Sequence, residues 1–480
     1  MSKVDWFLAT ILFILMWTKA LCLDQESLLK IRILLEENPL IGWMDRDMYS
    51  SLDDLGFTRR SLSYKEVNKS IIYNTPHAYH IKNLAYKALR GEEVNLAVLG
   101  GSISAGATLY KTGDQNKIYF KVFAEWWNKL FGTMTKSKMI YKNFAIGATG
   151  SDFYAYCLKN YIAPNDTDLI IWELSANDYH RFDNRDVPPT MPLELLIRNL
   201  RRLDSSPAIF AVHFFRGQDY IKEGECNNLE GDGANYILKY YGVPAVSWKR
   251  LVCRKLIASG SKGFHKLFAS DDSHPNVLGH AQMAFLMIEY FRRMIKDVVL
   301  DLIIPGEATM MPTNQVFIPN ETPPQLPKVL YTKSQLVASD PICYTFNVAS
   351  EGELPKNNMK IRVVRNDGYA VAVAHGFLVR KDKTRGLRTR SQGHELHLLV
   401  DVPVQISGDQ PDWMILVGTY SNLGGAVFFL NGHLSRVIET QKYAYGSIVA
   451  AVATHVPPGK HLLVIKSLSK GFFLSSLMLG

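Results

Sequence analysis

Short apolar runs alternate with amphipathic helical stretches between residues 91 and 300, and this alternation limits the folds open to the chain. The expected strands are Val94–Leu99, Met139–Phe144, Leu169–Leu174, Ile209–Phe214 and Val243–Ser247. The expected helices are Tyr119–Phe131, Phe153–Tyr161, Leu193–Leu203, Ala234–Tyr241 and Leu278–Val298. Strands that alternate with helices form a parallel sheet with helices on both faces. We therefore predict a three-layer α/β domain over residues 91–300.

The segments on either side of this domain differ from it in composition and in apolar pattern. Residues 23–90 are charged and helical, and we interpret them as an N-terminal extension without chemistry of its own. Residues 301–345 contain seven prolines, which interrupt regular elements and indicate a linker. Residues 346–480 carry short apolar or alternating runs between Gly, Asn and Asp turns. That pattern predicts an all-β sandwich of the jelly-roll type.

The first residues indicate secretion. Lys3 precedes the apolar run Trp6–Trp17, and the small residues of Ala20–Cys22 follow at the spacing of a cleavage site. This is the layout of a signal peptide over residues 1–22, which predicts a secreted or extracellular protein or one of the secretory lumen. The alternative is an uncleaved N-terminal membrane anchor.

The cysteines and glycosylation sequons agree with this route. Four cysteines remain after the predicted cleavage, an even number in an oxidising compartment. Cys226 and Cys253 are close enough to close a loop, which leaves Cys157 and Cys343 either paired or free. Sequons that predict a glycoprotein begin at Asn68, Asn165 and Asn320.

Composition excludes two classes of site. The net charge of +9 comes mostly from scattered basic residues, whereas nucleic-acid binding needs a clustered patch. The chain has no Cys-x-x-Cys spacing, so we expect no thiolate zinc site. We therefore expect neither a nucleic-acid partner nor a metal of this kind.

Four polar stretches fall where the predicted sheet would gather them at one edge. They are Gly100–Ser104, Asn143–Gly150, Trp172–Asp178 and Asp271–Asn276. The Gly100-Gly101 pair lets the backbone turn sharply after the first strand, which leaves Ser102 at the strand's carboxyl end. A serine is a poor nucleophile until a base takes its proton, and His274 can be that base.

The other groups that such a serine needs are also present. Asp271 lies three residues before His274 and can orient the imidazole. The oxyanion of a tetrahedral intermediate needs preformed donors. The Asn177 amide, the Ser102 N–H and one N–H from Gly147 or Ala148 can supply them.

In order and separation, these four stretches resemble the sequence blocks of the SGNH (GDSL-like) hydrolase superfamily of esterases, lipases and polysaccharide deacetylases. The resemblance covers roughly residues 91–300. It implies a flavodoxin-like domain and a Ser102–His274–Asp271 triad that works without metal or other cofactor.

The chain departs from the family's blocks at three positions. Gly101 stands where the family has Asp, and Ser175 stands where it has Gly. An ungapped comparison places Ala148 at the family's oxyanion glycine. Neither Gly147 nor Ala148 is therefore singled out as the second backbone donor.

Each candidate also has a purely structural interpretation. Asp271 and His274 can form a cluster at a helix N-terminus, and Asn177 can form a turn. Asp272 is a second candidate for the orienting acid. We interpret His213 as a core or rim histidine. Glu173 and Asp178 fit solvated positions better than a pocket lining.

The predicted β domain offers weaker signals. Six basic residues between Arg380 and Arg390 indicate a solvated hairpin loop; the alternative is a contact with anionic polysaccharide or membrane. Trp413, Tyr420 and Tyr443 either stack on sugars or belong to the core. The run Gly459–Lys466 resembles the closing strands of galactose-binding-like sandwiches, which suggests carbohydrate binding.

Taken together, these features predict a secreted serine esterase that cleaves a carboxylic ester through an acyl-enzyme. We expect its substrate to carry a short acyl group on a glycan. The alternatives are a lipase or phospholipid acyl hydrolase, an acyltransferase, and a non-catalytic binding protein on the same fold. The expected partners are accordingly an acylated small molecule, glycan or lipid.

Overall fold

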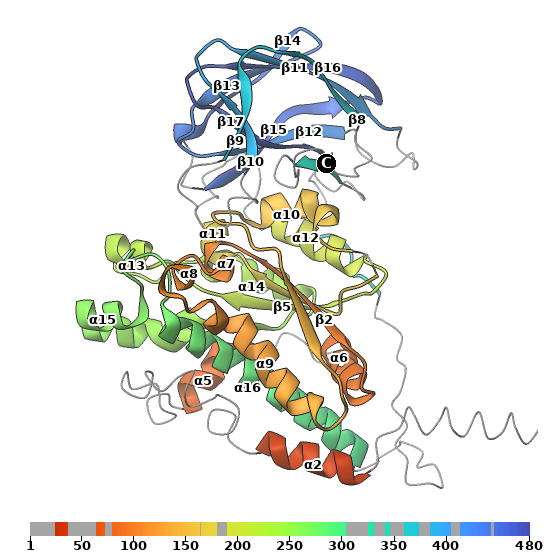
Figure 1. Cartoon of the computed structure of the whole chain (residues 1–480), viewed down its shortest axis with the longest axis vertical. Helices are drawn as coiled ribbons and strands as arrows, with labels where there is room; N and C mark the ends of the chain where they lie inside the picture. Colours follow the sequence, from red (N-terminus) through yellow and green to blue (C-terminus); the bar gives the residue numbers. More distant parts are fainter. Residues whose placement is uncertain are drawn as a thin grey trace, which may run out of the picture.

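A computed structural model gives the fold of residues 25–36, 64–72, 79–163, 165–179, 190–303, 325–330, 341–345, 360–373, 385–404, 413–442 and 446–480. These residues form an α/β domain and a β domain stacked along the longest axis of the molecule (Figure 1). The predicted signal peptide, its anchor alternative, most of the proline-rich linker and Tyr443 lie outside the described ranges. Among the described helices, none has the length and apolar content to cross a membrane.

The α/β domain is organised around a sheet in which the described strands run in the order β1-β6-β5-β4-β2-β3. Its strands are β1 (Ile71–Ile72), β2 (Val94–Gly100), β3 (Met139–Asn143), β4 (Leu169–Glu173), β5 (Ala208–His213) and β6 (Ala245–Ser247). Strands β2 to β6 are parallel, so all five predicted strands are present. Strand β1 was not predicted, and it adds an antiparallel edge from the N-terminal extension.

Helices cover both faces of this sheet, as predicted. They are α2 (Gln25–Glu36), α5 (Tyr64–Ser70), α6 (Tyr79–Leu89), α7 (Ser102–Ala105), α8 (Leu109–Thr112), α9 (Tyr119–Gly132), α10 (Ser151–Cys157), α11 (Ser175–Tyr179), α12 (Met191–Arg201), α13 (Gly217–Glu223), α14 (Ala234–Tyr240), α15 (Trp248–Leu267) and α16 (Val277–Ile303). Helix α15 was missed, and its non-helical Gly260, at a φ of 57°, interrupts the pattern that would have indicated it.

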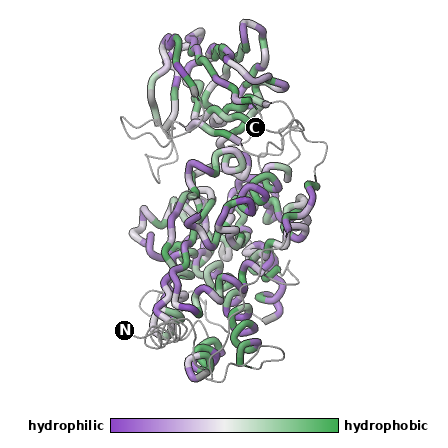
Figure 2. Tube along the Cα trace, turned by 90° about the vertical axis from the view of Figure 1, so that its right-hand side faces the viewer, coloured by the Kyte–Doolittle hydropathy of each residue, from purple (hydrophilic) through white to green (hydrophobic). Residues whose placement is uncertain are grey.

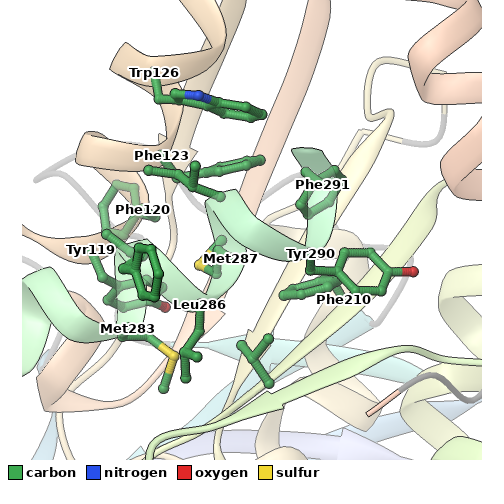
Figure 3. Close-up of a cluster of buried hydrophobic side chains, with 14 of the residues drawn as sticks. Tyr119, Phe120, Phe123, Trp126, Phe210, Met283, Leu286, Met287, Tyr290 and Phe291 are labelled. Atoms are coloured by element: carbon green, nitrogen blue, oxygen red, sulfur yellow. The ribbon is translucent and has the colours of Figure 1, made fainter. Parts of the chain in front are cut away.

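Alternating side chains of each parallel strand enter two cores. In β2, Leu96 and Val98 pack with α9 and α16, whereas Ala97 and Leu99 pack with α10 and α12 on the opposite face. Figure 3 shows the first core, where aromatic rings of α9 and β5 meet α16. The ring centroid of Phe291 lies 4.8 Å from that of Phe123 and 5.1 Å from that of Phe210. Burial on both faces explains why these strands are almost continuously apolar.

The β domain consists of two antiparallel sheets, with an apolar core formed by residues of both. In the described ranges one sheet has the order β15-β12-β17-β10-β9, with β7 paired to β17, and the other has β14-β13-β16-β11-β8. The strands are β7 (Ile342–Thr345), β8 (Lys360–Asn366), β9 (Tyr369–Val373), β10 (Arg385–Thr389), β11 (Glu395–Val402), β12 (Trp413–Tyr420), β13 (Gly425–Leu430), β14 (His433–Glu439), β15 (Ser447–Val456), β16 (Gly459–Ser467) and β17 (Phe473–Leu479). The predicted α/β domain followed by an antiparallel β region is thus confirmed.

Two details of the β domain separate the alternatives left open by the sequence. Trp413 and Tyr420 are buried, which favours the core interpretation over sugar stacking. The predicted basic hairpin loop is wrong in its second half, because Arg385–Thr389 forms β10 and pairs with β9 and β17. Gly386 suits this strand because a Cβ atom there would lie 2.5 Å from the carbonyl oxygen of Leu474 in β17.

Covalent and apolar contacts join the two domains. Cys157 of α10 forms a disulfide with Cys343 of β7, and Cys226 pairs with Cys253 inside the α/β domain. Met414, Leu416 and Met478 of the β domain belong to the same apolar cluster as helix α10. The chain's last residue lies at this junction in both views (Figures 1 and 2). The structure thus contains the expected Cys226–Cys253 loop closure, and it shows that Cys157 and Cys343, which the sequence left either paired or free, form a disulfide that links the domains.

Candidate active site

The turn after β2 places Ser102 at the first position of α7. Gly100 and Gly101 are required there because other side chains lie so close that a Cβ atom would clash with them. A Cβ atom on Gly100 would lie 2.4 Å from Ser104 Oγ, and one on Gly101 would lie 2.2 Å from Asn177 Nδ2. The absence of a side chain at Gly101 therefore lets the Asn177 amide lie against the backbone beside Ser102.

Ser102, His274 and Asp271 form a continuous hydrogen-bonded chain. His274 Nε2 lies 2.7 Å from Ser102 Oγ, and His274 Nδ1 lies 2.6 Å from Asp271 Oδ2. All three side chains are partly buried at the carboxyl edge of the parallel sheet. A carboxylate on one imidazole nitrogen and a hydroxyl on the other is the arrangement that can deprotonate the hydroxyl during attack on an electrophilic carbon.

Asp271 is held by the backbone as well as by the imidazole. Its Oδ1 accepts hydrogen bonds from the N–H groups of Ser273 and His274, at 3.1 and 3.0 Å. Burial by itself would raise the pKa of the Asp271 carboxyl. The hydrogen bond and charge of His274 and the two backbone donors outweigh burial and hold this pKa well below its usual range. Asp271 is therefore ionised at neutral pH.

The loop geometry shows which acid contacts the His274 ring and which residue caps the following helix. The Asp272 carboxylate lies 3.9 Å from the ring of His265, not beside His274, and its backbone has a φ of 54°. The N-terminus of α16 is capped by Asn276, whose Oδ1 accepts from the N–H of Leu278 at 2.9 Å. Asp271 is thus bonded to the His274 ring, and the helix-capping role belongs to Asn276.

The expected oxyanion donors lie on three neighbouring segments: the start of α7 with Ser102, the turn of Gly147 and Ala148 before α10, and α11 with Asn177. Asn177 is on α11, and its Nδ2 donates to the Thr149 carbonyl at 2.7 Å. Ala148, next to Thr149, has a left-handed φ of 56°. Neither the Ser102 N–H nor the Gly147 N–H donates a hydrogen bond to another described residue. These two donors can therefore serve a bound oxygen atom without breaking an internal bond.

Glu173 forms a buried support beneath α7. Its carboxylate accepts from Ser104 Oγ at 2.7 Å and from the Ser104 N–H at 3.2 Å. Ser104 Oγ also lies 2.7 Å from the hydroxyl of Tyr119. Burial raises the pKa of Glu173 to about 7, against hydrogen bonds from Ser104 and the backbone of Gly101 that lower it. This network fixes the helix that carries Ser102.

The predicted solvated positions of Glu173 and Asp178 are wrong. Both side chains are buried, and Asp178 accepts from the N–H and hydroxyl of Ser151, at 2.7 and 2.6 Å. Asp178 thus anchors the start of α10 next to the Asn177 amide. A usable signal was the position of Glu173 at the end of β4, a strand that is buried on both faces, and of Asp178 in the helix that follows it, where water is excluded.

Two further histidines lie near the site but do not join the chain of hydrogen bonds. His213 is fully buried, as the core interpretation expected, and no described residue hydrogen-bonds to its ring. His280 on α16 stacks on Tyr119 with ring centroids 5.9 Å apart. Burial lowers the pKa of His213 to about 4 and that of His280 to about 3. Both rings are therefore neutral at physiological pH. Within the described residues, no group of three or more His, Cys, Asp or Glu side chains could hold a metal ion.

Comparison with solved structures finds the same two-domain fold elsewhere. A two-domain esterase active on acetylated mannans, crystallised with mannopentaose, matches 86% of this chain and 97% of its own, at 20% identity and a TM-score of 0.59. A second structure of such an esterase gives the same values. An acetyl-xylooligosaccharide esterase from Geobacillus Stearmophilus matches 41% of this chain and 94% of its own, at 15% identity and a TM-score of 0.32. No family model and no curated protein matches the sequence.

Glu173→Gln should change how the stability of the protein depends on pH. The folded pKa is about 7 and the ordinary value is 4.5, so the stability that protonated Glu173 contributes below pH 4.5 is lost as the pH rises to 7. Between pH 4.5 and 7.5 the unmodified protein should lose about 3 kcal/mol of unfolding free energy relative to the variant. Urea unfolding at several pH values measures this difference. A difference that stays constant with pH would contradict it.

Proposed function

We propose that this chain is a secreted serine esterase of the SGNH type that hydrolyses short acyl esters, such as acetyl esters, on a glycan. The observation that carries the esterase proposal is the Ser102–His274–Asp271 chain, with contacts of 2.7 and 2.6 Å at one sheet edge. The order of the four sequence blocks supports the SGNH type. The described fold is shared with a two-domain esterase that is active on acetylated mannans, which supports a glycan ester as substrate.

The proposed reaction begins with the attack of Ser102 Oγ on the ester carbonyl carbon. His274 Nε2 takes the hydroxyl proton, and Asp271 stabilises the imidazolium that forms. The carbonyl oxygen becomes an oxyanion, bound by the Ser102 N–H, the Asn177 amide and one N–H of Gly147 or Ala148. When the ester C–O bond breaks, His274 returns the proton to the leaving alcohol, and an acyl-Ser102 remains.

Water completes the proposed cycle. His274 takes a proton from a water molecule as its oxygen attacks the acyl carbon, and the same donors bind the second oxyanion. The bond to Ser102 Oγ then breaks, and His274 returns the proton to the serine. The products are a carboxylic acid and the free enzyme. An acceptor hydroxyl in place of this water would make the reaction an acyl transfer.

Secretion is supported by two features besides the predicted signal peptide. The two disulfides suit an oxidising compartment. Asn165, which begins one of the sequons, is exposed on the surface of the α/β domain, where a glycan can be attached.

Ser102→Ala should abolish hydrolysis of p-nitrophenyl acetate, because it removes the attacking oxygen. A fluorophosphonate probe should label the unmodified protein at Ser102 and leave the variant unlabelled. Circular dichroism should show the same fold for both proteins, since the change removes one partly buried hydroxyl. Full activity in the variant would exclude Ser102 as the nucleophile. An unmodified protein that is neither active nor labelled would favour the non-catalytic binding alternative.

Asp271→Asn and Asp272→Asn form a matched pair that tests the orienting acid. Asp271→Asn should lower kcat by about 10³- to 10⁴-fold, because a neutral amide favours the wrong imidazole tautomer and cannot stabilise the imidazolium. Asp272→Asn should change kcat less than about 3-fold, since its carboxylate faces His265. The measurement is kcat for p-nitrophenyl acetate. The reverse order of effects would make Asp272 the orienting acid.

A chain-length series distinguishes the glycan ester from the lipid alternative. With p-nitrophenyl esters of two to sixteen carbons, kcat/KM should be highest for acetyl and fall with each longer acyl chain. Acetylated mannan should then release acetate in the presence of the protein. Highest activity on long acyl chains, with hydrolysis of phospholipid vesicles, would favour a lipase instead.

A further inference from the structure

The turn that carries the proposed second backbone donor is in direct contact with the β domain. The carbonyl of Ala148 accepts a hydrogen bond of 2.8 Å from the N–H of Ser447, the first residue of β15. Ala148 has the left-handed φ of 56°, a conformation that residues other than glycine adopt at an energetic cost. Such a conformation persists where the surroundings hold it. The hydrogen bond from Ser447 is one such restraint.

Strand β15 can make this contact because it lies at the edge of its described sheet. It is the last strand of its described sheet and pairs there with β12 on one side. Its other side offers backbone N–H groups at alternate residues, as an edge strand does. The N–H of Ser447 donates to Ala148, and the N–H of Val449, two residues later, donates to Asp152 Oδ2 at 3.3 Å. The edge is thus used to dock the catalytic domain.

The same turn also holds the Asn177 amide. Thr149, directly after Ala148, accepts from Asn177 Nδ2 at 2.7 Å through its carbonyl. A rotation of the turn would therefore move a backbone donor and the amide donor together. Both are needed at one point to bind the oxyanion, and displacements of about 1 Å in such groups can cost 100-fold in rate.

Other contacts hold the two domains together near this hydrogen bond. The Cys157–Cys343 disulfide ties α10 to β7, and Asn160 Nδ2 donates to the Cys343 carbonyl at 3.2 Å. Tyr156 packs so closely on Gly480 that a Cβ atom on this glycine would lie 2.4 Å from its ring. Apolar side chains of β12 and β17 belong to the same buried cluster as those of α10. The position of β15 against the turn is therefore fixed by several independent contacts.

We propose that the β domain is part of the catalytic unit, and that Ser447 is a positioning residue. Its N–H holds the Ala148 carbonyl, and through it the turn that aligns the oxyanion donors. This inference rests on the proposed function, in which that turn faces the reacting carbonyl oxygen. It gives the β domain a role in the rate of the reaction, separate from any binding of carbohydrate.

Ser447→Pro in the full-length chain removes this hydrogen bond selectively. Proline has no N–H, and the lost donor faces away from β12, so the pairing within the sheet is kept. We expect kcat for p-nitrophenyl acetate to fall by about 10-fold or more, because the oxyanion donors lose their alignment. KM should change less than about 3-fold. The matched control is Val449→Pro, which removes the adjacent docking bond to Asp152 and disturbs more apolar packing, and it should lower kcat by less than about 3-fold.

Hydrogen exchange supplies a readout that does not depend on catalysis. The amides of residues 147–150 should exchange faster in Ser447→Pro than in Val449→Pro or the unmodified protein. An unchanged kcat in Ser447→Pro, or an equal loss in both proline variants, overturns the inference and leaves the proposed esterase intact. If the unmodified protein has no esterase activity, the proposed function fails. In that case amide exchange at residues 147–150 still tests whether Ser447 restrains the turn. Equal exchange rates in Ser447→Pro and Val449→Pro would overturn that restraint.

Two disulfide variants cover the case in which Ser447→Pro does not fold. Cys157→Ser with Cys343→Ser loosens the domain junction without changing β15. Cys226→Ser with Cys253→Ser removes the disulfide inside the α/β domain and is the matched control. The first pair should lower kcat and speed exchange at residues 147–150, and the second should do neither. Equal effects of the two pairs overturn the inference.

Discussion

The parallel pairing of β2 with β4 determines where Ser102, Asn177 and the buried Glu173 lie relative to one another. In this register Gly100 lies opposite Glu173, so the two strands end side by side. The chain then turns at Gly101 into Ser102 and, on the neighbouring strand, at Leu174 into the helix of Asn177. Because Gly100 has no side chain, Ser104 can reach the Glu173 carboxylate below it. One sheet register thus brings together the proposed nucleophile, a proposed oxyanion donor and the buried acid that supports them.

Much of this arrangement could be predicted because it follows from local periodicity and from edge geometry. Continuous apolar runs identified the five parallel strands, and parallel strands place their carboxyl ends at one edge. Ser102, Asn177 and His274 each follow or lie beside such an end. Glu173 and Asp178 were misjudged because acidic side chains are solvated in most proteins. The buried carboxylates bind Ser104 and Ser151, which come from distant segments of the chain. No local sequence pattern indicates these partners.

The junction between the domains was the larger omission, although part of its signal was present. Strands β12 and β17 are buried along their whole length, whereas β11 alternates between buried and half-buried residues. A strand that is apolar at every position has both faces covered. One face of β12 and β17 lies in the β-domain core, and the other packs on α10. The edge contact of β15 could not be foreseen, because it uses backbone atoms, which every sequence offers equally.

The hydrogen bond between Ser447 and Ala148 also has a consequence for the order in which the molecule is completed. A chain emerges from the ribosome from its N-terminus, and domains generally fold as units during synthesis. The α/β domain therefore emerges with Ser102, His274 and Asp271 in place, while the strand that restrains its turn is still to be made. About 300 residues separate Ala148 from Ser447 in the sequence. A newly made α/β domain passes through an interval in which its proposed catalytic residues are assembled but its turn lacks this restraint.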